Sequence, residues 1–465
     1  MRLTVLGGGG FRVPLVHQAL LDDAGDPAGR CTELVLYDTD RRRLDAIGAV
    51  LARQAERHRE RPDAPGPAPA VRATTDLDDA LRGADFVFSA IRVGGLAGRV
   101  GDERVPLAEG VLGQETVGAG GVLYGLRTLP VAVRIAERIA DVAPDAWVIN
   151  FTNPAGMVTE AMCRVFRERG LGDRVIGICD SPVGLCRRAA RALGADPDRA
   201  GYDYVGINHL GWLRRVVVDG DDRLPGLLAD PVALGTFEEG KLFGADWLRA
   251  LGALPNEYLH YYYFNREAVA SLRGADATRG EFLHAQQSRF YEGLTDRLDG
   301  GGSGTGDGAG AGDAYDAWER NRREREETYM AESRESTGGW QRDSCDLEGG
   351  GYDRVALALM RAVARNERTT LILNVPNRGA VPGVDHDAVV EVPCLVDASG
   401  ARPLSTGAVA PDQLGLMLTL KGVERAAIEA AATGSRDAAL RALALHPLVD
   451  SVRVADRILS TAGGF

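Results

Sequence analysis

A cluster of four glycines directly follows the first apolar stretch of the chain, where residues 7–14 read GGGGFRVP. A backbone that turns sharply after a buried strand directs amide N–H groups and a helix N-terminus at one point, which favours an anion. Gly7 and Gly9 stand at the first two glycine positions of the dinucleotide-binding fingerprint, and Gly10 adds another position without a Cβ. Arg12 stands where the third fingerprint glycine belongs. The turn therefore predicts a site for a phosphate-bearing cofactor, with one departure from the usual spacing.

Asp38 indicates which cofactor this turn would bind. It directly follows the second apolar stretch, Glu33–Tyr37. A carboxylate at the end of the second strand accepts hydrogen bonds from the adenosine ribose hydroxyls, and it would repel the extra phosphate of NADP. The simpler alternative is a glycine-rich turn followed by a helix-capping aspartate. Because strand, helix, strand and aspartate occur in this order, we expect an NAD site.

The elements that must position these residues alternate between strand and helix over the first half of the chain. The predicted strands are Leu3–Leu6, Glu33–Tyr37, Phe86–Ile91, Trp147–Phe151, Val175–Ile178 and Tyr204–Ile207. Amphipathic stretches such as Val13–Leu21 and Arg41–Ala55 predict helices between them, and Ala64–Ala70 predicts a Pro/Ala-rich loop. This alternation is typical of an α/β fold with a Rossmann-like, doubly wound parallel sheet.

After about residue 213 the alternation is less regular. Helices are predicted over 314–334, 351–366, 413–433 and 437–446, and strands over Leu371–Asn374 and Val389–Val396. The stretch 300–313 reads GGGSGTGDGAGAGD, a composition typical of a flexible loop. We therefore expect an NAD-binding domain over 1–208 and an α+β substrate- and metal-binding domain with C-terminal helices over 209–465.

Composition excludes several classes of protein. A net charge of −12 disfavours a nucleic-acid binder, which would normally carry a basic face. No secretory signal is visible, and no apolar run approaches the ~20 residues that cross a bilayer. The six cysteines are scattered without a CxxC pair, as in reduced proteins. We expect a cytoplasmic enzyme without membrane or nucleic-acid partners.

Six further motifs occur in one order along the chain. They are IRVGG (91–95), GQET (113–116), NFTNPAG (150–156), ICDSPVG (178–184), NHLGW (208–212) and PNEYLHYYYF (255–264). Together they resemble glycoside hydrolase family 4, the NAD- and Mn-dependent glycosidases, over about residues 1–290. LILNVPNRGAV and VEVPCLV extend a weaker match to about residue 397. The opening departs from the family, where GGGS is usual, because Gly10 and Phe11 follow here.

The resemblance implies a redox-assisted elimination, since NAD-dependent glycosidases depart from the usual two-carboxylate scheme. NAD would take hydride from the sugar C3, and the resulting ketone would make the C2 proton acidic. A base would remove that proton, the C1–O bond would break, water would add, and NADH would return the hydride. A divalent metal would bind the C2 and C3 oxygens as a Lewis acid.

The resemblance also implies which residues bind the metal, namely Cys179 and His209. Because both follow predicted strands, they could project into the cleft at the carboxyl ends of the sheet. A thiolate and an imidazole suit a borderline cation such as Mn²⁺ and leave positions for substrate oxygens. Outside the family context, Cys179 would be read as a small buried apolar residue and His209 as a hydrogen-bonded polar one.

Tyr258 matches the family's tyrosine base, and Asp180 matches a residue that assists the leaving group in some members. A tyrosine has a usual pKa of ~10, so a nearby cation must lower it before the anion can act near neutral pH. Tyr261, Tyr262 and Tyr263 are rival candidates, although most are more simply explained as an aromatic core segment.

Four residues match substrate-facing positions of the family: Arg92, Asn153, Asn208 and Arg279. An arginine fork suits a sugar phosphate, although a lone arginine is more often a solvated surface group. Glu115 of the GQET motif would orient the ribose end or a metal-bound water, or make a structural hydrogen bond.

Two motifs give conflicting indications of which anomer the site prefers. NFTNPAGMVTEA (150–161) is similar to the 6-phospho-β-glucosidase branch, whereas ICDSP with Asp180 is closer to the α branch. We favour a 6-phospho-β-glucosidase acting on a phosphorylated disaccharide or aryl glycoside. The alternatives are a 6-phospho-α-glucosidase or a non-phosphorylated glycosidase of the same family.

Two further alternatives belong to other classes. The first alternative, an NAD-dependent 2-hydroxy acid dehydrogenase, is less favoured, although lactate and malate dehydrogenases share this overall fold plan. The second alternative is a non-catalytic NAD sensor. The family resemblance implies a homodimer or homotetramer.

Overall fold

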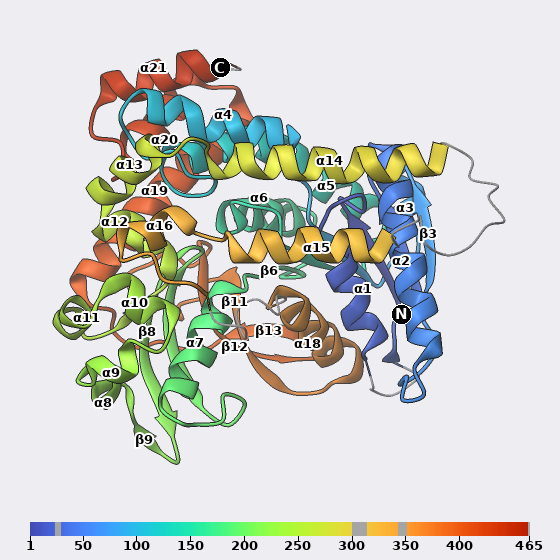
Figure 1. Cartoon of the computed structure of the whole chain (residues 1–465), viewed down its shortest axis with the longest axis horizontal. Helices are drawn as coiled ribbons and strands as arrows, with labels where there is room; N and C mark the ends of the chain where they lie inside the picture. The colour runs from blue at the N-terminus through green and yellow to red at the C-terminus, as the bar shows by residue number, and fades with distance from the viewer. Residues whose placement is uncertain (24–28, 300–313, 343–350, 464–465) are drawn as a thin grey trace.

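The computed structural model describes residues 1–23, 29–299, 314–342 and 351–463, and Figure 1 shows their arrangement. A 13-stranded sheet runs through this part of the chain. Eleven of its strands lie in the order β10-β8-β7-β12-β11-β6-β5-β4-β1-β2-β3, while β13 pairs with β12 and β9 with β8.

One half of the sheet is parallel. Its strands are β1 (Arg2–Leu6), β2 (Glu33–Tyr37), β3 (Ala70–Thr74), β4 (Phe86–Ser89), β5 (Trp147–Asn150) and β6 (Val175–Gly177). Their order, β3-β2-β1-β4-β5-β6, is that of the dinucleotide-binding fold, in which the order reverses between β1 and β4. The predicted Rossmann-like sheet is therefore confirmed. β3 was not predicted, because this exposed edge strand, AVRAT, carries no apolar run.

The other half is antiparallel. It contains β7 (Gly201–Ile207), β8 (Leu210–Val218), β9 (Asp221–Asp222), β10 (Leu254–Pro255), β11 (Thr369–Pro376), β12 (Val389–Asp397) and β13 (Gly400–Pro403). β11 pairs antiparallel with β6, and β12 pairs antiparallel with β7. The expectation that β7 continues the parallel sheet is wrong, because the β11–β12 hairpin separates it from β6. The predicted domain boundary after residue 208 falls in the β7–β8 turn, and the sheet continues across it.

Helices join and cover these strands. In the first half they are α1 (Val13–Leu21), α2 (Arg41–Glu60), α3 (Leu77–Leu81), α4 (Gly95–Ala108), α5 (Gly118–Val142), α6 (Ala155–Glu168) and α7 (Ser181–Ala192). Short helices follow β8: α8 (Leu224–Leu228), α9 (Pro231–Leu234), α10 (Glu238–Phe243), α11 (Ala245–Leu251), the 3₁₀ helix η2 (Glu257–Leu259), α12 (His260–Tyr263) and α13 (Asn265–Gly274).

Longer helices complete the chain. They are α14 (Arg279–Asp299), α15 (Ala314–Glu327), α16 (Ala331–Ser336), α18 (Tyr352–Arg365), α19 (Pro411–Thr433), α20 (Arg436–Ala444) and α21 (Val452–Ala462). The single helix predicted over 314–334 is two helices, and Met330 between them has a left-handed φ of 49°. The predicted flexible loop 300–313 and Cys345 lie outside the described residues.

The central strands are buried because helices cover them. β4, with the sequence FVFS, is buried along its whole length, as expected for a strand of a parallel sheet covered on both faces. α14 and α15 pack on each other and on α2, and both cross the front of the molecule in Figure 1. They bring Arg279 of α14 and Arg325 and Glu326 of α15 to the cavity at the carboxyl ends of the strands.

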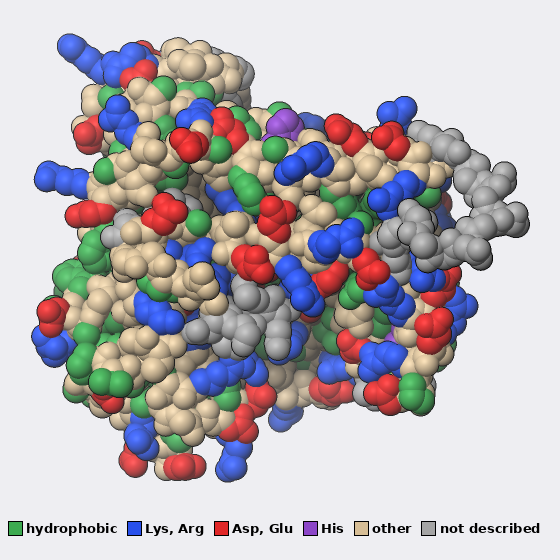
Figure 2. Space-filling model, in the orientation of Figure 1, with side chains coloured by type: hydrophobic (Ala, Val, Ile, Leu, Met, Phe, Trp, Pro, Cys, Tyr) green, Lys and Arg blue, Asp and Glu red, His purple; other side chains and the backbone are tan. Residues whose placement is uncertain are grey.

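The surface carries charges of both signs. On the face shown in Figure 2, acidic and basic side chains are interspersed. Arg57 of α2 donates to Asp316 of α15 at 2.8 Å, so some of these charges tie helices together. Within the described ranges, no helix is both long enough and apolar enough to cross a bilayer.

Candidate active site

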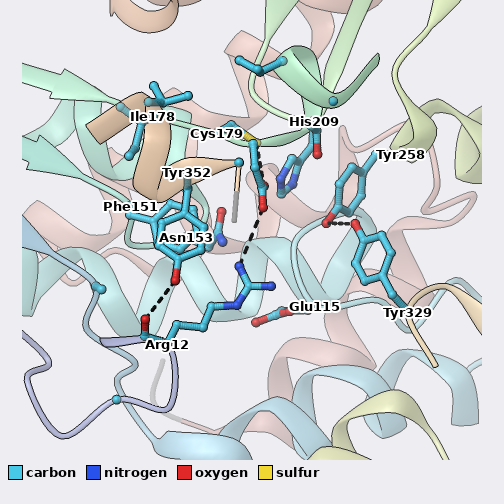
Figure 3. Close-up of a pocket in the computed structure, with 18 of the residues that line it drawn as sticks. Arg12, Glu115, Phe151, Asn153, Ile178, Cys179, His209, Tyr258, Tyr329 and Tyr352 are labelled. Atoms are coloured by element: carbon cyan, nitrogen blue, oxygen red, sulfur yellow. Dashed lines mark hydrogen bonds and ion pairs between the residues drawn. The ribbon is translucent and has the colours of Figure 1, made fainter. Parts of the chain in front are cut away.

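A cavity of about 1540 Å³ opens at the carboxyl ends of the central strands. It brings together ten of the twelve predicted site residues: Gly7, Gly10, Asp38, Arg92, Asn153, Cys179, Asp180, His209, Tyr258 and Arg279. Gly9 and Asn208 do not line it. Residues separated by more than 250 positions in the sequence thus face one space, part of which is shown in Figure 3.

The glycine turn forms a cradle at the end of β1. Gly7 has a φ of +84°, which favours glycine, and a Cβ on it would lie 2.6 Å from the Ala90 carbonyl oxygen. A Cβ on Gly10 would lie 2.8 Å from the Gly7 carbonyl oxygen, which accepts the Gly10 N–H at 2.9 Å. The backbone can therefore close this tightly only without side chains, and the turn fits the pyrophosphate of a dinucleotide.

Asp38 lies at the end of β2, beside this turn. Its Oδ2 accepts the Gly9 N–H at 3.1 Å, and its Oδ1 accepts the Asp40 N–H at the same distance. The Gly9 carbonyl accepts a hydrogen bond from Tyr291 at 2.8 Å. Gly9 thus holds Asp38 in place rather than lining the cavity, and Asp38 still faces the space where a ribose would lie.

Arg12 is a site residue that the sequence analysis noted only as a departure. It lies at the N-terminus of α1 and extends into the cavity, over the ring of Tyr352 at 5.3 Å. Its guanidinium lies 3.8 Å from Asp180 and 3.9 Å from Glu326. Burial alone would lower the pKa of Arg12, but the neighbouring acidic groups raise it, so the cation is retained.

Cys179 and His209 come together although β6 and β7 are not neighbours. Cys179 lies just after β6, and His209 lies in the two-residue turn between β7 and β8. Both residues are buried and line the cavity, as Figure 3 illustrates. His209 has a φ of +61°, a conformation uncommon for residues other than glycine that is often found at functional sites.

The two strands of the β11–β12 hairpin lie between β7 and β6 in the sheet. Asn374 of β11 donates to Glu391 of β12 at 2.8 Å, and Tyr204 of β7 donates to the same carboxyl group at 3.0 Å. Asn208 donates to Glu391 at 3.5 Å and accepts the Ala155 N–H at 3.2 Å. Asn208 therefore has a structural place next to His209, and its predicted contact with substrate has no support from its position.

Thr116 of the GQET motif determines which nitrogen of His209 is available. The Gln114 side-chain oxygen, which can only accept, lies 3.2 Å from the Thr116 hydroxyl. The Thr116 hydroxyl therefore donates to Gln114 and accepts from His209 Nδ1, 2.9 Å away. This arrangement places the proton on Nδ1 and leaves Nε2 with a free lone pair, as a metal ligand requires.

The protonation state of His209 fits metal binding, whereas Cys179 would have to lose its proton. Burial lowers the pKa of His209 to about 4, so the imidazole is neutral at physiological pH. Burial raises the pKa of the Cys179 thiol, and the nearby Glu391 raises it further, so a cation would have to displace its proton. Among the described residues, no three His, Cys, Asp or Glu side chains form a metal-binding group. The pair therefore fits a cation that also takes oxygen ligands from substrate or water.

We expect Thr116→Val to weaken divalent-cation binding about 10- to 100-fold, the usual effect of removing the partner of a metal-binding histidine. The substitution keeps the side-chain shape but removes the group that fixes the His209 tautomer. Titration of the protein with Mn²⁺, followed by calorimetry, measures this. Thr116→Ser keeps the hydroxyl and is the matched control, and equal affinities of the valine variant and the wild type would contradict the assignment.

Tyr258 stacks directly on His209. The ring centroids are 3.7 Å apart and the planes differ by 11°. Burial raises the pKa of Tyr258, and the nearby Glu257 raises it further. Of the rival tyrosines, Tyr261 also lines the cavity, whereas Tyr262 and Tyr263 do not.

A network of ion pairs forms another part of the cavity wall. Glu115 pairs with Arg92, and with Arg99 at 2.5 Å. Although burial alone would raise the pKa of Glu115, these guanidinium groups lower it, so the carboxylate is charged. Arg92 is thus held by Glu115, and the expected structural bond of this glutamate is present.

Two arginines from the crossing helices complete the wall. Arg279 donates to the Thr328 hydroxyl at 2.5 Å and to the Arg325 carbonyl at 2.7 Å. Burial and the neighbouring cations Arg12 and Arg279 lower the pKa of Arg325 to about 9. A cluster with this excess of positive charge suits an anionic ligand. Arg325 could not be predicted as a site residue, because it belongs to no motif and lies in a helix rich in charged residues.

Glu257 is a buried carboxyl group behind the tyrosine. It accepts a hydrogen bond from the Ser181 hydroxyl at 2.6 Å. Burial raises the pKa of Glu257 from 4.5 to about 8, and Glu239 contributes.

This shift predicts how stability depends on pH. Between about pH 4.5 and about pH 8 the folded state holds a proton on Glu257 that the unfolded state has lost, so the free energy of unfolding falls as pH rises. Glu257→Gln removes this contribution. We expect the variant to gain stability relative to the wild type as pH rises through this window, measured by urea unfolding of the metal-free protein. The exposed Glu292→Gln is the control, and a constant difference across the window would contradict the prediction.

Comparison with known proteins relates both halves of the chain to one family. Residues 2–195 match the family model described as "Family 4 glycosyl hydrolase". Residues 204–449 match the one described as "Family 4 glycosyl hydrolase C-terminal domain".

Curated relatives extend over nearly the whole chain. It is 30% identical over 469 residues to the "Probable 6-phospho-beta-glucosidase" of Bacillus subtilis (strain 168), covering 99% of this chain and 95% of that protein. It is also 30% identical over 475 residues to the maltose-6'-phosphate glucosidase of the same organism, covering 98% and 94%. Sequence identity therefore does not separate the two kinds of relative.

Solved structures agree with this relationship. The 6-phospho-beta glucosidase from Thermotoga maritima, solved with NAD and glucose-6-phosphate, has a TM-score of 0.77 and 26% identity, covering 99% of this chain and 98% of its own. A 6-phospho-alpha-glucosidase from gut microorganisms, in complex with NAD and Mn²⁺, has a TM-score of 0.77 and 25% identity, covering 99% and 97%.

Proposed function

The chain belongs to glycoside hydrolase family 4, and from this premise we propose that it hydrolyses 6-phospho-β-glucosides with NAD and a divalent cation such as Mn²⁺. One observation carries the proposal. The glycine turn, the thiol–imidazole pair, the stacked tyrosine and the arginine cluster all face a single cavity. A family glycosidase needs these four parts around one sugar.

Different residues of the cavity would bind the cofactor and the cation. Gly7, Gly10 and Asp38 would hold NAD, and Cys179 with His209 would hold the cation. When bound, NAD supplies a reversible oxidation of the sugar, and the cation supplies a Lewis acid for the sugar oxygens. The free Nε2 of His209 and the pyrophosphate-sized cradle at Gly7 are the features of this structure that fit the two groups.

Tyr258 would take the proton from C2 of the sugar. The bond from C2 to hydrogen breaks, its electron pair stays on the sugar, and an O–H bond forms on the tyrosine. Asp180 would assist the departing oxygen at C1. Asp180 lies 3.8 Å from the Arg12 guanidinium, so this pairing holds its carboxyl group at the edge of the space where the leaving group would lie.

The phosphate of the substrate would lie against the arginine cluster. Arg279 and Arg325 present positive charge to the cavity, and Arg12 lies close enough to add to it. The preference for the β anomer rests on the similarity of residues 150–161 to the β branch, since relatives of both kinds are equally similar in sequence. A 6-phospho-α-glucosidase is therefore the second candidate.

Two broader expectations remain part of the proposal. We propose that the chain has two functional units, one that binds NAD over 1–208 and one that binds substrate over 209–465. The sheet itself is continuous across this boundary. The active enzyme would be a homodimer or homotetramer.

The proposal is tested with paired α- and β-nitrophenyl glucosides, each with and without a 6-phosphate. We expect release of nitrophenol from the 6-phospho-β-glucoside only when NAD and Mn²⁺ are both present, without accumulation of NADH. A dehydrogenase would instead accumulate NADH, and an NAD sensor would bind NAD without turnover. Failure to hydrolyse any of the four substrates, or full activity without NAD, would overturn the proposal.

A further inference from the structure

The oxygen of Tyr258 has a hydrogen-bond partner that no motif indicated. The hydroxyl of Tyr329 lies 3.0 Å from the hydroxyl of Tyr258, although the two residues are 71 positions apart. Figure 3 shows the two rings meeting end to end beside His209. Within the described part of the chain, no other side chain is hydrogen-bonded to the Tyr258 oxygen.

The surroundings of Tyr329 fix the position of its hydroxyl. Tyr329 lies between α15 and α16, and the Arg342 guanidinium lies 5.0 Å from the centre of its ring. Arg334 Nε donates to the Tyr329 carbonyl at 3.1 Å. The next residue, Met330, is buried and has a left-handed φ, so the turn after Tyr329 is closely defined. The hydroxyl is therefore held by both its ring and its backbone.

A second acceptor lies next to the same hydroxyl. The Glu257 Oε1 atom is 3.5 Å from the Tyr329 oxygen and is also bonded to the Ser181 hydroxyl. A single hydroxyl proton can be given to only one acceptor at a time. The contact with the Tyr258 oxygen is the shorter of the two, at 3.0 Å against 3.5 Å, so Tyr329 donates to Tyr258.

From this geometry we infer that Tyr329 is a positioning residue for proton removal by Tyr258. Its hydroxyl donates to the Tyr258 oxygen at 3.0 Å and so holds that oxygen in one place beside His209. The inference rests on the proposed function, in which Tyr258 is the base. It adds a residue from a segment far outside the motifs that carry the family resemblance.

Tyr329→Phe removes the hydroxyl and keeps the ring under Arg342. We expect kcat on the 6-phospho-β-glucoside to fall roughly 10- to 100-fold, the effect of losing a hydrogen bond to a charged group, with little change in KM. The primary isotope effect with substrate deuterated at C2 should increase, because proton removal becomes slower than the other steps. This ratio does not depend on how much of the variant is folded. NAD and Mn²⁺ affinities, measured directly by titration, should stay within about twofold.

A double-substitution cycle and a control separate positioning from general damage. In a Tyr258→Phe background, Tyr329→Phe should have no further effect, since Tyr329 acts only through Tyr258. Tyr262→Phe is the matched control, because Tyr262 is in the same aromatic segment as Tyr258 but stacks on His446 outside the cavity. It should leave kcat unchanged.

An unchanged kcat and isotope effect in Tyr329→Phe would overturn this inference alone, provided that the wild type requires NAD. The same result follows if Tyr329→Phe costs as much in the Tyr258→Phe background as in the wild type. A wild type that works fully without NAD would instead overturn the proposed function and this inference with it.

Discussion

Replacement of Cys179 by alanine is expected to weaken Mn²⁺ binding by more than about 100-fold and to lower turnover by roughly 1000-fold or more. The proposed cation site has two protein ligands, the Cys179 thiolate and the His209 imidazole. Without the thiolate, a cation would keep only one of them. Loss of the cation would remove the Lewis acid on which removal of the C2 proton depends. Calorimetric titration with Mn²⁺ and steady-state kinetics measure the two effects separately.

The matched control is Cys163→Ala. Cys163 is also buried and also has a raised pKa caused by burial, but it lies on α6 and does not line the cavity. It should keep wild-type Mn²⁺ affinity. Retention of tight Mn²⁺ binding by Cys179→Ala would contradict the assignment of the thiol as a ligand, whatever happened to activity.

The second large effect is expected for Tyr258→Phe. Removing a general base usually costs about 10²- to 10⁴-fold in rate, and we expect a fall in kcat within this range. The stacking on His209 survives the change, because phenylalanine keeps the ring. Oxidation of the sugar precedes removal of the C2 proton, so NADH absorbance should build up in a single turnover while nitrophenol release stays slow.

Tyr261→Phe provides the comparison for this experiment. Tyr261 is the other tyrosine of the YYY segment that lines the cavity, and it is almost fully buried. If its substitution, rather than that of Tyr258, produced the loss of kcat with retained NADH formation, the base would be Tyr261. The expected outcome is near-normal turnover for Tyr261→Phe.

The parallel half of the fold could be predicted because its information is local. Apart from the exposed edge strand β3, each strand is an apolar run followed by its own helix, so β1, α1 and β2 were expected within one residue of their observed bounds. The antiparallel half could not be predicted in the same way. The pairing of β11 with β6 joins residues almost 200 positions apart, and nothing in either sequence indicates the partner.

The same distinction holds for the candidate site. Residues inside compact motifs, such as Cys179 and His209, were predicted from the family resemblance that those motifs carry, and both line the cavity. Thr116 stands in a quoted motif, yet its role depends on a distance to His209 that the sequence does not contain. Arg325 and Tyr329 come from a helical region whose charged composition indicates only a solvated surface. Their positions follow from the path of α15 over the cavity.

The β11–β12 hairpin has a consequence for the order in which parts of the site form while the ribosome synthesises the chain. It inserts between β6 and β7, the strands that precede Cys179 and His209, and it is built from residues 369–397. The strands of the parallel half, β1 to β6, are all synthesised before residue 178. The side chains of Cys179 and His209 reach their final places only after residues 369–397 have been synthesised and have paired between β6 and β7. The two residues proposed to hold the cation are therefore completed as a pair later in synthesis than the glycine turn and Asp38, which are proposed to hold NAD.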